Sequence, residues 1–159
     1  MGSQEVKAGG FVGVISDTHG LLRPEAFGAL MGSELIIHAG DVGGPEVLEE
    51  LGRLAPLVAV RGNNDRGAWA ESLPEYEAIE VNGTFIYVLH DLKELDIAPA
   101  GFRVVVSGHS HKPLVEERRG VLYLNPGSAG PRRFKLPVIV ARLKVNGDDV
   151  SAEIINLDV

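Results

Sequence analysis

Phe11-Val12-Gly13-Val14-Ile15-Ser16-Asp17-Thr18-His19-Gly20 joins a short apolar run to a polar turn. The apolar run is rich in β-branched residues, which predicts a buried strand over 11–15. Asp17 and His19 follow it two positions apart, so in an extended segment both side chains point to the same side. In open α/β sheets, ligands bind just beyond the carboxyl ends of the strands. The stretch therefore predicts a strand that ends at a binding site.

The same succession of apolar run and polar turn recurs twice within the first 65 residues. Strands are predicted over 34–39 and 57–60, and they end at Gly40-Asp41 and at Arg61-Gly62-Asn63-Asn64-Asp65. Helices are predicted between the strands, over 24–31 and 46–53, each beside a proline, which suits the first turn of a helix. This alternation predicts a parallel, right-handed βαβαβ unit.

The second half of the chain is richer in strands. Asn82-Gly83 lies between apolar runs over 76–81 and 84–89, which is the strongest short-range signal of a β-hairpin. Further strands are predicted over 103–107, 114–117, 121–124, 137–143 and 150–155. An α/β half followed without a linker by a strand-rich half predicts two sheets packed face to face, with helices outside. We expect one domain over residues 11–159, preceded by a polar, glycine-rich and disordered leader over 1–10.

The composition excludes several classes of function. The 159 residues include 22 acidic and 15 basic ones, and the net charge of −7 argues against nonspecific nucleic-acid binding, which needs a basic face. A bound divalent metal would invert that sign locally, so small anionic substrates are allowed. No apolar run reaches the ~20 residues that span a bilayer. No membrane association is expected, a cytoplasmic location is the default expectation, and the oligomeric state is left open, a homo-oligomer included.

Residues that can bind metal ions gather at the ends of the predicted strands instead of being scattered through the chain. There are seven of them: Asp17, His19, Asp41, Asn63, His90, His109 and His111. They include four of the five histidines of the protein. The fifth, His38, lies inside an apolar run and is predicted to be a hydrogen-bonded core residue.

The seven side chains are too many for one tetrahedral ion, but they suffice for two divalent ions that share a carboxylate. Because the chain has no cysteine, any metal is bound through oxygen and nitrogen. Such a mixed set suits Mn, which we expect first, or Ni, Fe, Co or Zn, better than Ca or Mg. Two such ions ~3.5–4 Å apart clamp an in-line displacement at phosphorus and lower the pKa of a water between them.

The series Asp17-x-His19, Gly40-Asp41, Gly62-Asn63-Asn64-Asp65, His90 and Gly108-His109-Ser110-His111 resembles the signature of the calcineurin-like metallophosphoesterases. The short chain, with Asn125-Pro126-Gly127-Ser128 and Pro131-Arg132, resembles the small prokaryotic phosphodiesterase branch of that superfamily. The resemblance implies an α/β fold, a four-layer α/β/β/α sandwich of two mixed β-sheets. It also implies that Asp17, His19 and His111 hold one metal. Asn63, His90 and His109 would hold the other, and Asp41 would bridge the two.

Three positions need separate interpretation. The superfamily often has a histidine where this chain has Asn64, and an amide hydrogen-bonds a phosphate oxygen but cannot protonate a leaving group as an imidazolium does. This favours activated diesters over monoesters with poor leaving groups. Asp91 stands where glycine is common, and it either orients His90 or faces water. Residues 125–128 either shape the rim of the cleft or only form a β-turn.

The leading hypothesis is therefore a dinuclear metal-dependent phosphodiesterase for small-molecule substrates. A metal-bridging hydroxide would attack phosphorus, with Asp41, Asn64 and His109 as the catalytic residues. One rival is a protein-interaction scaffold on the same fold, as in a retromer subunit with a degraded metal site. The complete set of seven ligands argues against it. The other rival is a phosphomonoesterase.

Overall fold

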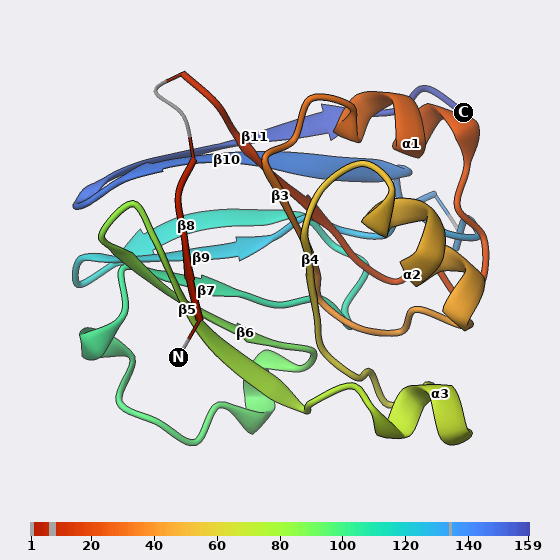
Figure 1. Cartoon of the computed structure of the whole chain (residues 1–159), viewed down its shortest axis with the longest axis horizontal. Coiled ribbons are helices and arrows are strands. Elements are labelled where there is room, and N and C mark those ends of the chain that lie inside the picture. Colours follow the sequence, from red (N-terminus) through yellow and green to blue (C-terminus); the bar gives the residue numbers. More distant parts are fainter. Residues whose placement is uncertain (1, 7–8, 134) are drawn as a thin grey trace.

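The computed structural model describes every residue except 1, 7, 8 and 134, and it is built on two β-sheets (Figure 1). One sheet contains five strands. In spatial order they are β11 (Asp149–Asn156), β10 (Ile139–Asn146), β2 (Val12–Ile15), β3 (Leu35–His38) and β4 (Leu57–Ala59). β2, β3 and β4 run parallel, as the predicted βαβαβ unit requires, whereas β10 runs antiparallel to both β2 and β11.

The other sheet contains six strands and is also mixed. In spatial order they are β1 (Gly2–Gln4), β5 (Tyr76–Val81), β6 (Thr84–Leu89), β7 (Val104–Val106), β9 (Val121–Asn125) and β8 (Leu114–Arg118). β5 and β6 form the hairpin predicted around Asn82-Gly83. β6, β7 and β9 run parallel to one another, so their carboxyl ends lie at the same edge of the sheet.

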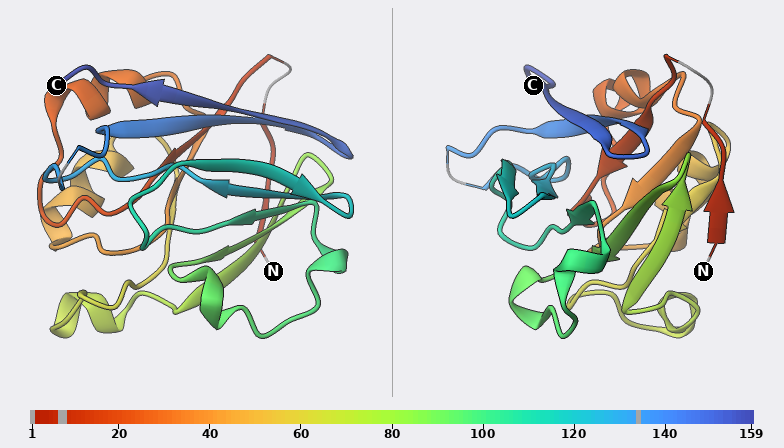
Figure 2. Two further views of the ribbon diagram at one scale, coloured as in Figure 1. Left: turned by 180° about the vertical axis from the view of Figure 1, so that it is seen from behind. Right: turned by 90° about the vertical axis from the view of Figure 1, so that its left-hand side faces the viewer.

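The main core lies between the two sheets, and alternation along the strands decides which side chains enter it. Val12 and Val14 of β2 face the second sheet, whereas Ile15 packs on the other side among residues of the helices. α1 (Pro24–Leu30), α2 (Pro45–Gly52) and the short α3 (Ala68–Glu71) contribute to this second cluster. The two longer helices cover the outer face of the five-stranded sheet (Figure 2).

The outer layer of the six-stranded sheet is thinner. It is built from two 3₁₀ helices, η1 (Leu92–Glu94) and η2 (Pro99–Gly101), and the chain beside them. Leu92 and Phe102 from this segment pack against Tyr87 and Val105 of the sheet. The predicted class, two mixed sheets sandwiched between helical layers, is confirmed, with 3₁₀ turns where the resemblance implied α-helices. Among the described residues, no helix has the length and apolar character needed to cross a membrane.

The start of the chain differs from the disordered leader that the sequence predicted over 1–10. Residues 2–4 form β1, which pairs with β5 in parallel. Val6 is buried, and the side-chain amide of Asn82 holds its backbone: Oδ1 accepts from the Val6 N–H at 2.8 Å and Nδ2 donates to the Val6 carbonyl at 2.7 Å. Backbone pairing at a sheet edge needs no apolar pattern, which is why β1 has no signal in the sequence. Residues 1, 7 and 8 of the predicted leader lie outside the described residues.

Candidate metal centre

The candidate ligands come from loops that follow strands of both sheets. The loops after β2, β3 and β4 carry Asp17, His19, Asp41 and Asn63, and the loops after β6 and β7 carry His90, His109 and His111. The carboxyl ends of parallel strands meet at one edge of a sheet. The two sheets bring these edges together, so that side chains far apart in sequence converge on one place.

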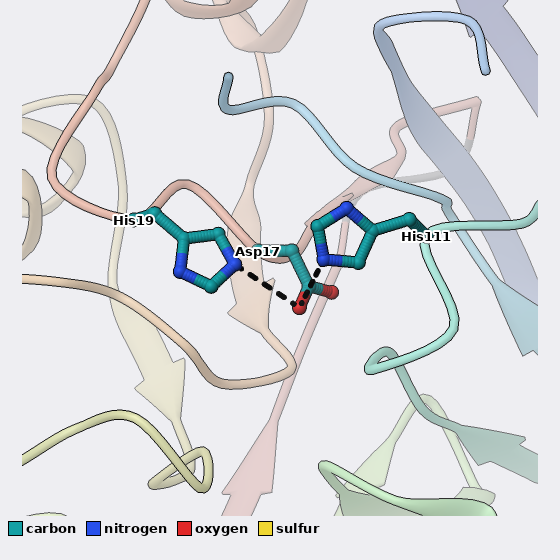
Figure 3. Close-up of side chains that lie close together, drawn as sticks. All are labelled: Asp17, His19 and His111. Carbon is teal, nitrogen blue, oxygen red and sulfur yellow. Dashed lines mark ion pairs between the residues drawn. The ribbon is translucent and has the colours of Figure 1, made fainter. Parts of the chain in front are cut away.

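Asp17, His19 and His111 form the first group (Figure 3). Both imidazole rings point at the same carboxylate oxygen: His111 Nε2 lies 3.4 Å and His19 Nε2 3.8 Å from Asp17 Oδ1. Asp17 is fully buried, and its other oxygen accepts hydrogen bonds from the Ser16 hydroxyl at 2.6 Å and the His109 N–H at 3.1 Å. One carboxylate oxygen is thus fixed by the protein, and the other faces two histidines.

Asp41 and His90 form the second group together with Asp17. His90 Nε2 lies 3.3 Å from Asp41 Oδ2 and 3.9 Å from Asp17 Oδ1. His90 Nδ1 lies 2.7 Å from the Ala39 carbonyl, which can only accept, so Nδ1 carries the proton. In the neutral ring, Nε2 is therefore the nitrogen with a free lone pair, and it faces the two carboxylates.

Asn63 and His109 lie at the open side of this cluster. His109 Nδ1 is 3.1 Å from Asn63 Oδ1, and both residues are more exposed than the other five. The His109 ring meets the His90 ring edge to face at 5.2 Å between centroids. All seven predicted residues therefore lie in one neighbourhood, five in a compact group of which only His19 is not buried, and two at its open side.

Four buried polar atoms of this cluster have no hydrogen-bond partner among the described residues: Asp17 Oδ1, His19 Nε2, His90 Nε2 and His111 Nδ1. The first three come from only two loops, after β2 and after β6, and they face one another. Buried polar groups are nearly always paired, and leaving one unpaired costs about 1–3 kcal/mol. A divalent cation would satisfy these first three at once, because carboxylate oxygen and neutral imidazole nitrogen are its usual ligands. The residues present therefore fit a metal ion.

The backbone of the candidate ligands is unusual. Five of the seven have a positive φ: Asp17 (56°), His19 (47°), Asp41 (55°), His109 (71°) and His111 (63°). This left-handed region is sparsely populated by residues other than glycine, and residues held there cluster at functional sites. The left-handed conformation thus occurs at five residues whose side chains contribute to the candidate metal centre.

The electrostatics of the cluster favour charged carboxylates. Burial raises the pKa of Asp41, but the adjacent His90 ring and the two hydrogen bonds from Asn64 outweigh it, and the pKa lies below its usual range. Burial likewise raises the pKa of Asp17, and His111 and Ser16 lower it further than burial raises it. Burial lowers the pKa of His90, whereas Asp41 and Asp17 raise it above the usual value. The site thus concentrates negative charge that a cation would balance.

Asn64 and Asp91, two of the three positions that needed interpretation, each lie beside a candidate metal ligand. The Asn64 backbone N–H donates to Asp41 Oδ1 at 2.9 Å, and its side-chain amide donates to Asp41 Oδ2 at 3.1 Å. Asp91 accepts from the Lys93 N–H at 3.1 Å at the start of η1. Its other oxygen lies 3.7 Å from His109 Nε2, so the histidine it approaches is His109.

Residues 125–128 form hydrogen bonds with the backbone of two ligand loops. The Asn125 amide donates to the Gly108 carbonyl at 2.9 Å, and the Ser128 hydroxyl donates to the Asp17 carbonyl at 3.1 Å. Each bond fixes a loop that carries candidate ligands. The turn over 125–128 therefore anchors the loops after β2 and β7.

Asp65 is a supporting residue to which the sequence analysis gave no role. Its carboxylate accepts from three backbone N–H groups: Val42 at 3.1 Å, Gly43 at 3.0 Å and Gly62 at 2.9 Å. It thereby ties the loop after β3 to the loop after β4. The signal was present, since Asp65 ends the polar block that begins at Arg61, but that block reads equally well as an ordinary turn.

His38 is the buried histidine that the sequence analysis excluded from the site, and the structure confirms this. Nδ1 accepts from the Gly40 N–H at 3.1 Å, so the proton is on Nε2, which lies 3.0 Å from the Thr18 hydroxyl. Thr18 in turn donates to the Val42 carbonyl at 2.8 Å. Both ring nitrogens are satisfied by the protein, and neither is available to a metal.

Comparison with known proteins gives consistent results. The profile of the calcineurin-like phosphoesterase superfamily domain matches residues 11–148. A probable metallophosphoesterase of Methanothermobacter thermautotrophicus is 37% identical over 158 residues, which cover 91% of each chain. A phosphodiesterase of Methanocaldococcus jannaschii is 29% identical over 149 residues, 80% of this chain and 89% of that one.

Solved structures share the fold. One of an archaeal phosphodiesterase matches with a TM-score of 0.75 at 24% identity, covering 91% of this chain and 99% of that one. Vps29 of Chaetomium thermophilum matches with a TM-score of 0.75 at 20% identity, covering 92% of this chain and 97% of that one. The profile match, the curated relative and the fold agree, and the chain belongs to the calcineurin-like phosphoesterase superfamily.

Proposed function

We propose that the protein is a metal-dependent phosphodiesterase that hydrolyses small-molecule phosphodiesters at two divalent ions. The observation that carries the proposal is the set of buried, mutually facing atoms Asp17 Oδ1, His19 Nε2 and His90 Nε2, for which the described residues provide no hydrogen-bond partner. The superfamily is one of metal-dependent phosphoesterases, and one relative is named a phosphodiesterase.

We assign the ligands in two sets. Asp17, His19 and His111 would hold one ion, Asn63, His90 and His109 the other, and Asp41 would bridge them. Mn is our first expectation, with Ni, Fe, Co and Zn as the other candidates, because the donors are imidazole nitrogens and carboxylate oxygens. When bound, the ions would supply positive charge for the phosphate oxygens and lower the pKa of the attacking water.

The residues of the chain have separate tasks in this proposal. Asn64 uses one amide hydrogen on Asp41, and the second hydrogen of the same amide is free to donate to a phosphate oxygen. Its contact with Asp41 also fixes the orientation of that carboxylate. His109, at the open side of the cluster, lies where a substrate enters. Since no imidazolium stands at position 64, the leaving alcohol takes its proton from water, which favours esters with good leaving groups.

The main alternative is a protein-interaction scaffold, because Vps29 proteins share the fold. A scaffold does not require unsatisfied polar atoms in its interior, and such atoms cost stability if nothing binds them. The unpaired cluster therefore favours the enzyme. A phosphomonoesterase is the alternative within enzymes, and substrate comparison separates it.

The decisive experiment measures hydrolysis as a function of metal. Protein stripped by chelator is reloaded with Mn, Ni, Co, Zn or Mg and assayed on bis-p-nitrophenyl phosphate beside p-nitrophenyl phosphate. We expect diester turnover that Mn restores, that exceeds monoester turnover, and that falls at least a hundredfold in His109→Ala. Glu49→Gln, which alters an exposed carboxylate of α2 away from the ligand set, is the control and should retain turnover. Two bound ions without turnover on either ester would support the scaffold instead.

The ligand assignment has its own test, because Asp17 Oδ1 lies within 4 Å of three histidines and so competes with Asp41 for the bridging role. If Asp41 bridges, Asp41→Asn should lose both ions, whereas Asp17→Asn should lose one. Metal content measured by mass spectrometry after gel filtration distinguishes the two variants. The reverse pattern would assign the bridge to Asp17.

A further inference from the structure

A second feature lies beside the candidate metal centre: a cavity of about 940 Å³ that none of the roles described so far explains. Its lining residues are Ser110, His111, Lys112, Arg133, Lys135 and Leu136. Three of the six are cationic, and none is acidic. This is unusual in a chain whose net charge is −7.

Among the residues that the structure describes, the three cations have no acidic partners. Elsewhere on the surface, arginines pair with glutamates, as Arg61 does with Glu75 at 3.0 Å and Arg103 with Glu117 at 2.7 Å. In the described part of the chain, no carboxylate lies within 4.0 Å of the charged groups of Lys112, Arg133 or Lys135. Unpaired like charges around one cavity repel one another, and an anion in the cavity would relieve that repulsion.

The cavity adjoins the metal centre through one shared residue. His111 lines the cavity, and its Nε2 lies 3.4 Å from Asp17 Oδ1. Ser110 and Lys112, its neighbours in the chain, line the same cavity. A ligand held by the cations would therefore lie one side chain away from the proposed site of hydrolysis.

On the opposite side of the metal centre, acidic residues predominate instead of basic ones. A cavity of about 650 Å³ there is lined by the candidate ligands Asn63 and His90, with Asp91, Glu94 and Asp96 among its carboxylates. Of its two arginines, Arg61 is already paired with Glu75. A further negative group on a substrate is therefore disfavoured on this side and favoured on the side of His111.

We infer that the basic cavity formed by Lys112, Arg133 and Lys135 binds a second phosphate group of the substrate. This rests on the proposed function and deepens it. The substrate class becomes phosphodiesters with a further phosphate on one of the two ester substituents. The scissile phosphate lies at the metal centre, the extra phosphate lies beyond His111, and the remaining substituent faces the acidic cavity.

A matched pair of substrates tests the inference. Thymidine 5′-(p-nitrophenyl phosphate) and its 3′-phosphorylated form release the same chromophore and differ by one phosphate. Exposed charge pairs contribute up to about 1 kcal/mol each, which is roughly fivefold. With three cations, the Mn-loaded protein should show a kcat/KM at least about tenfold higher for the phosphorylated ester, and this preference should shrink as salt is added.

The variants remove one cation at a time. Arg133→Ala and Lys135→Ala should each lower the preference by about three- to fivefold, and the double variant should abolish it. Turnover of the unphosphorylated ester should be unchanged in both, because neither residue belongs to the proposed metal site. Lys144→Ala, which removes an exposed cation of β10 outside the cavity, is the matched control and should keep the full preference.

A binding measurement separates this inference from the proposed function. Calorimetry of the Mn-loaded protein should show tighter binding of thymidine 3′,5′-bisphosphate than of thymidine 5′-phosphate, and the double variant should remove the difference. Tighter bisphosphate binding without hydrolysis of any ester would support the phosphate site and overturn the phosphodiesterase. Equal kcat/KM values for both esters together with equal affinities for both nucleotides would overturn the phosphate site and leave the phosphodiesterase standing.

Discussion

His38 shows how a buried residue beside the centre is kept from acting as a ligand. Its pKa is lowered to about 4, chiefly because burial disfavours the charged ring, although Asp17 and Asp65 act in the opposite direction. The hydrogen bond that Nδ1 accepts from Gly40 also has to break before that nitrogen takes up a proton. The imidazole is therefore neutral at any pH near 7, and both its nitrogens serve the loops after β2 and β3.

This gives a prediction for the pH dependence of stability. The unfolded chain binds a proton at this histidine below about pH 6.5, whereas the folded protein binds it only below about pH 4. As the pH falls from 6.5 towards 4, the unfolded state gains protons that the folded state cannot accept, so stability is lost. Between pH 7.5 and pH 5 this residue should cost about 2 kcal/mol of unfolding free energy.

Urea unfolding of metal-free protein across this range provides the measurement, with His38→Gln as the comparison. Glutamine accepts from Gly40 and donates to Thr18 without a titrating group. The variant should therefore lose about 2 kcal/mol less than the unaltered protein over the same pH interval. Equal losses in the two proteins would show that His38 is not the group responsible.

At the scale of elements, close approach between loops decides where the ligands stand. A Cβ at Gly62 would lie 2.1 Å from both the backbone nitrogen and Oδ1 of Asp41, so only glycine lets the loop after β4 pass the loop after β3. Asp65 ties the same two loops together by hydrogen bonds. The position of Asp41 thus depends on a residue that has no side chain.

Gly62→Ala should displace Asp41 and weaken metal binding at least tenfold, while destabilising the protein by about 1–3 kcal/mol through overpacking. Gly28→Ala is the matched control, since Gly28 lies inside α1 with nothing within 4 Å of an added Cβ. It should leave metal binding unchanged and stabilise by about 0.5–1 kcal/mol. Calorimetric titration with Mn and urea unfolding report both effects. Unchanged affinity in Gly62→Ala would mean that the loop moves without moving Asp41.

The elements that the sequence predicted well are those with a local signal. The strands over 12–15 and 35–38 are short apolar runs, and Asn82-Gly83 specifies its hairpin through turn chemistry. β1 was missed because Gly2–Gln4 has no apolar alternation and pairs with residues more than 70 positions away. α3 has only four residues, too few to show helical periodicity. Local patterns thus predict elements that local chemistry specifies, and they miss those that tertiary pairing creates.

The features of the candidate site also fall into those that the sequence predicts locally and those that depend on tertiary packing. The seven ligand types and their order could be read from the strand ends, because parallel strands deliver their carboxyl ends to one edge. The left-handed backbone at Asp17 and Asp41, and the contact between Asp91 and His109, could not. The first depends on how the loops pack against one another, and the second on where η1 lies beside the sheet. The residue types predicted which side chains could bind a metal. The backbone conformations and contacts that hold those side chains in place became visible only in the structure.

At the scale of the whole molecule, the centre joins the two sheets. The first ligand group combines Asp17 and His19 from the five-stranded sheet with His111 from the six-stranded sheet, and the second combines Asp41 with His90 in the same way. Without a cation, two buried carboxylates of the five-stranded sheet and unpaired histidine nitrogens of both sheets face one another among the described residues. A metal bound there would therefore stabilise the contact between the sheets as well as preparing the site.

Metal should accordingly raise the stability of the folded protein, because the unfolded chain has no such site. At a free Mn concentration a hundred times Kd, one site contributes about 2.7 kcal/mol, which corresponds to a rise in Tm of about 5–10 °C for a chain of this size. Calorimetric scans of stripped and Mn-loaded protein measure it, and Asp41→Asn serves as the comparison because it removes the shared ligand without changing the core between the sheets. The rise should vanish in that variant. An equal rise in both proteins would place the stabilising metal elsewhere, whereas bound metal with no rise in either would show that the unfolded chain binds the ion as tightly as the folded protein does.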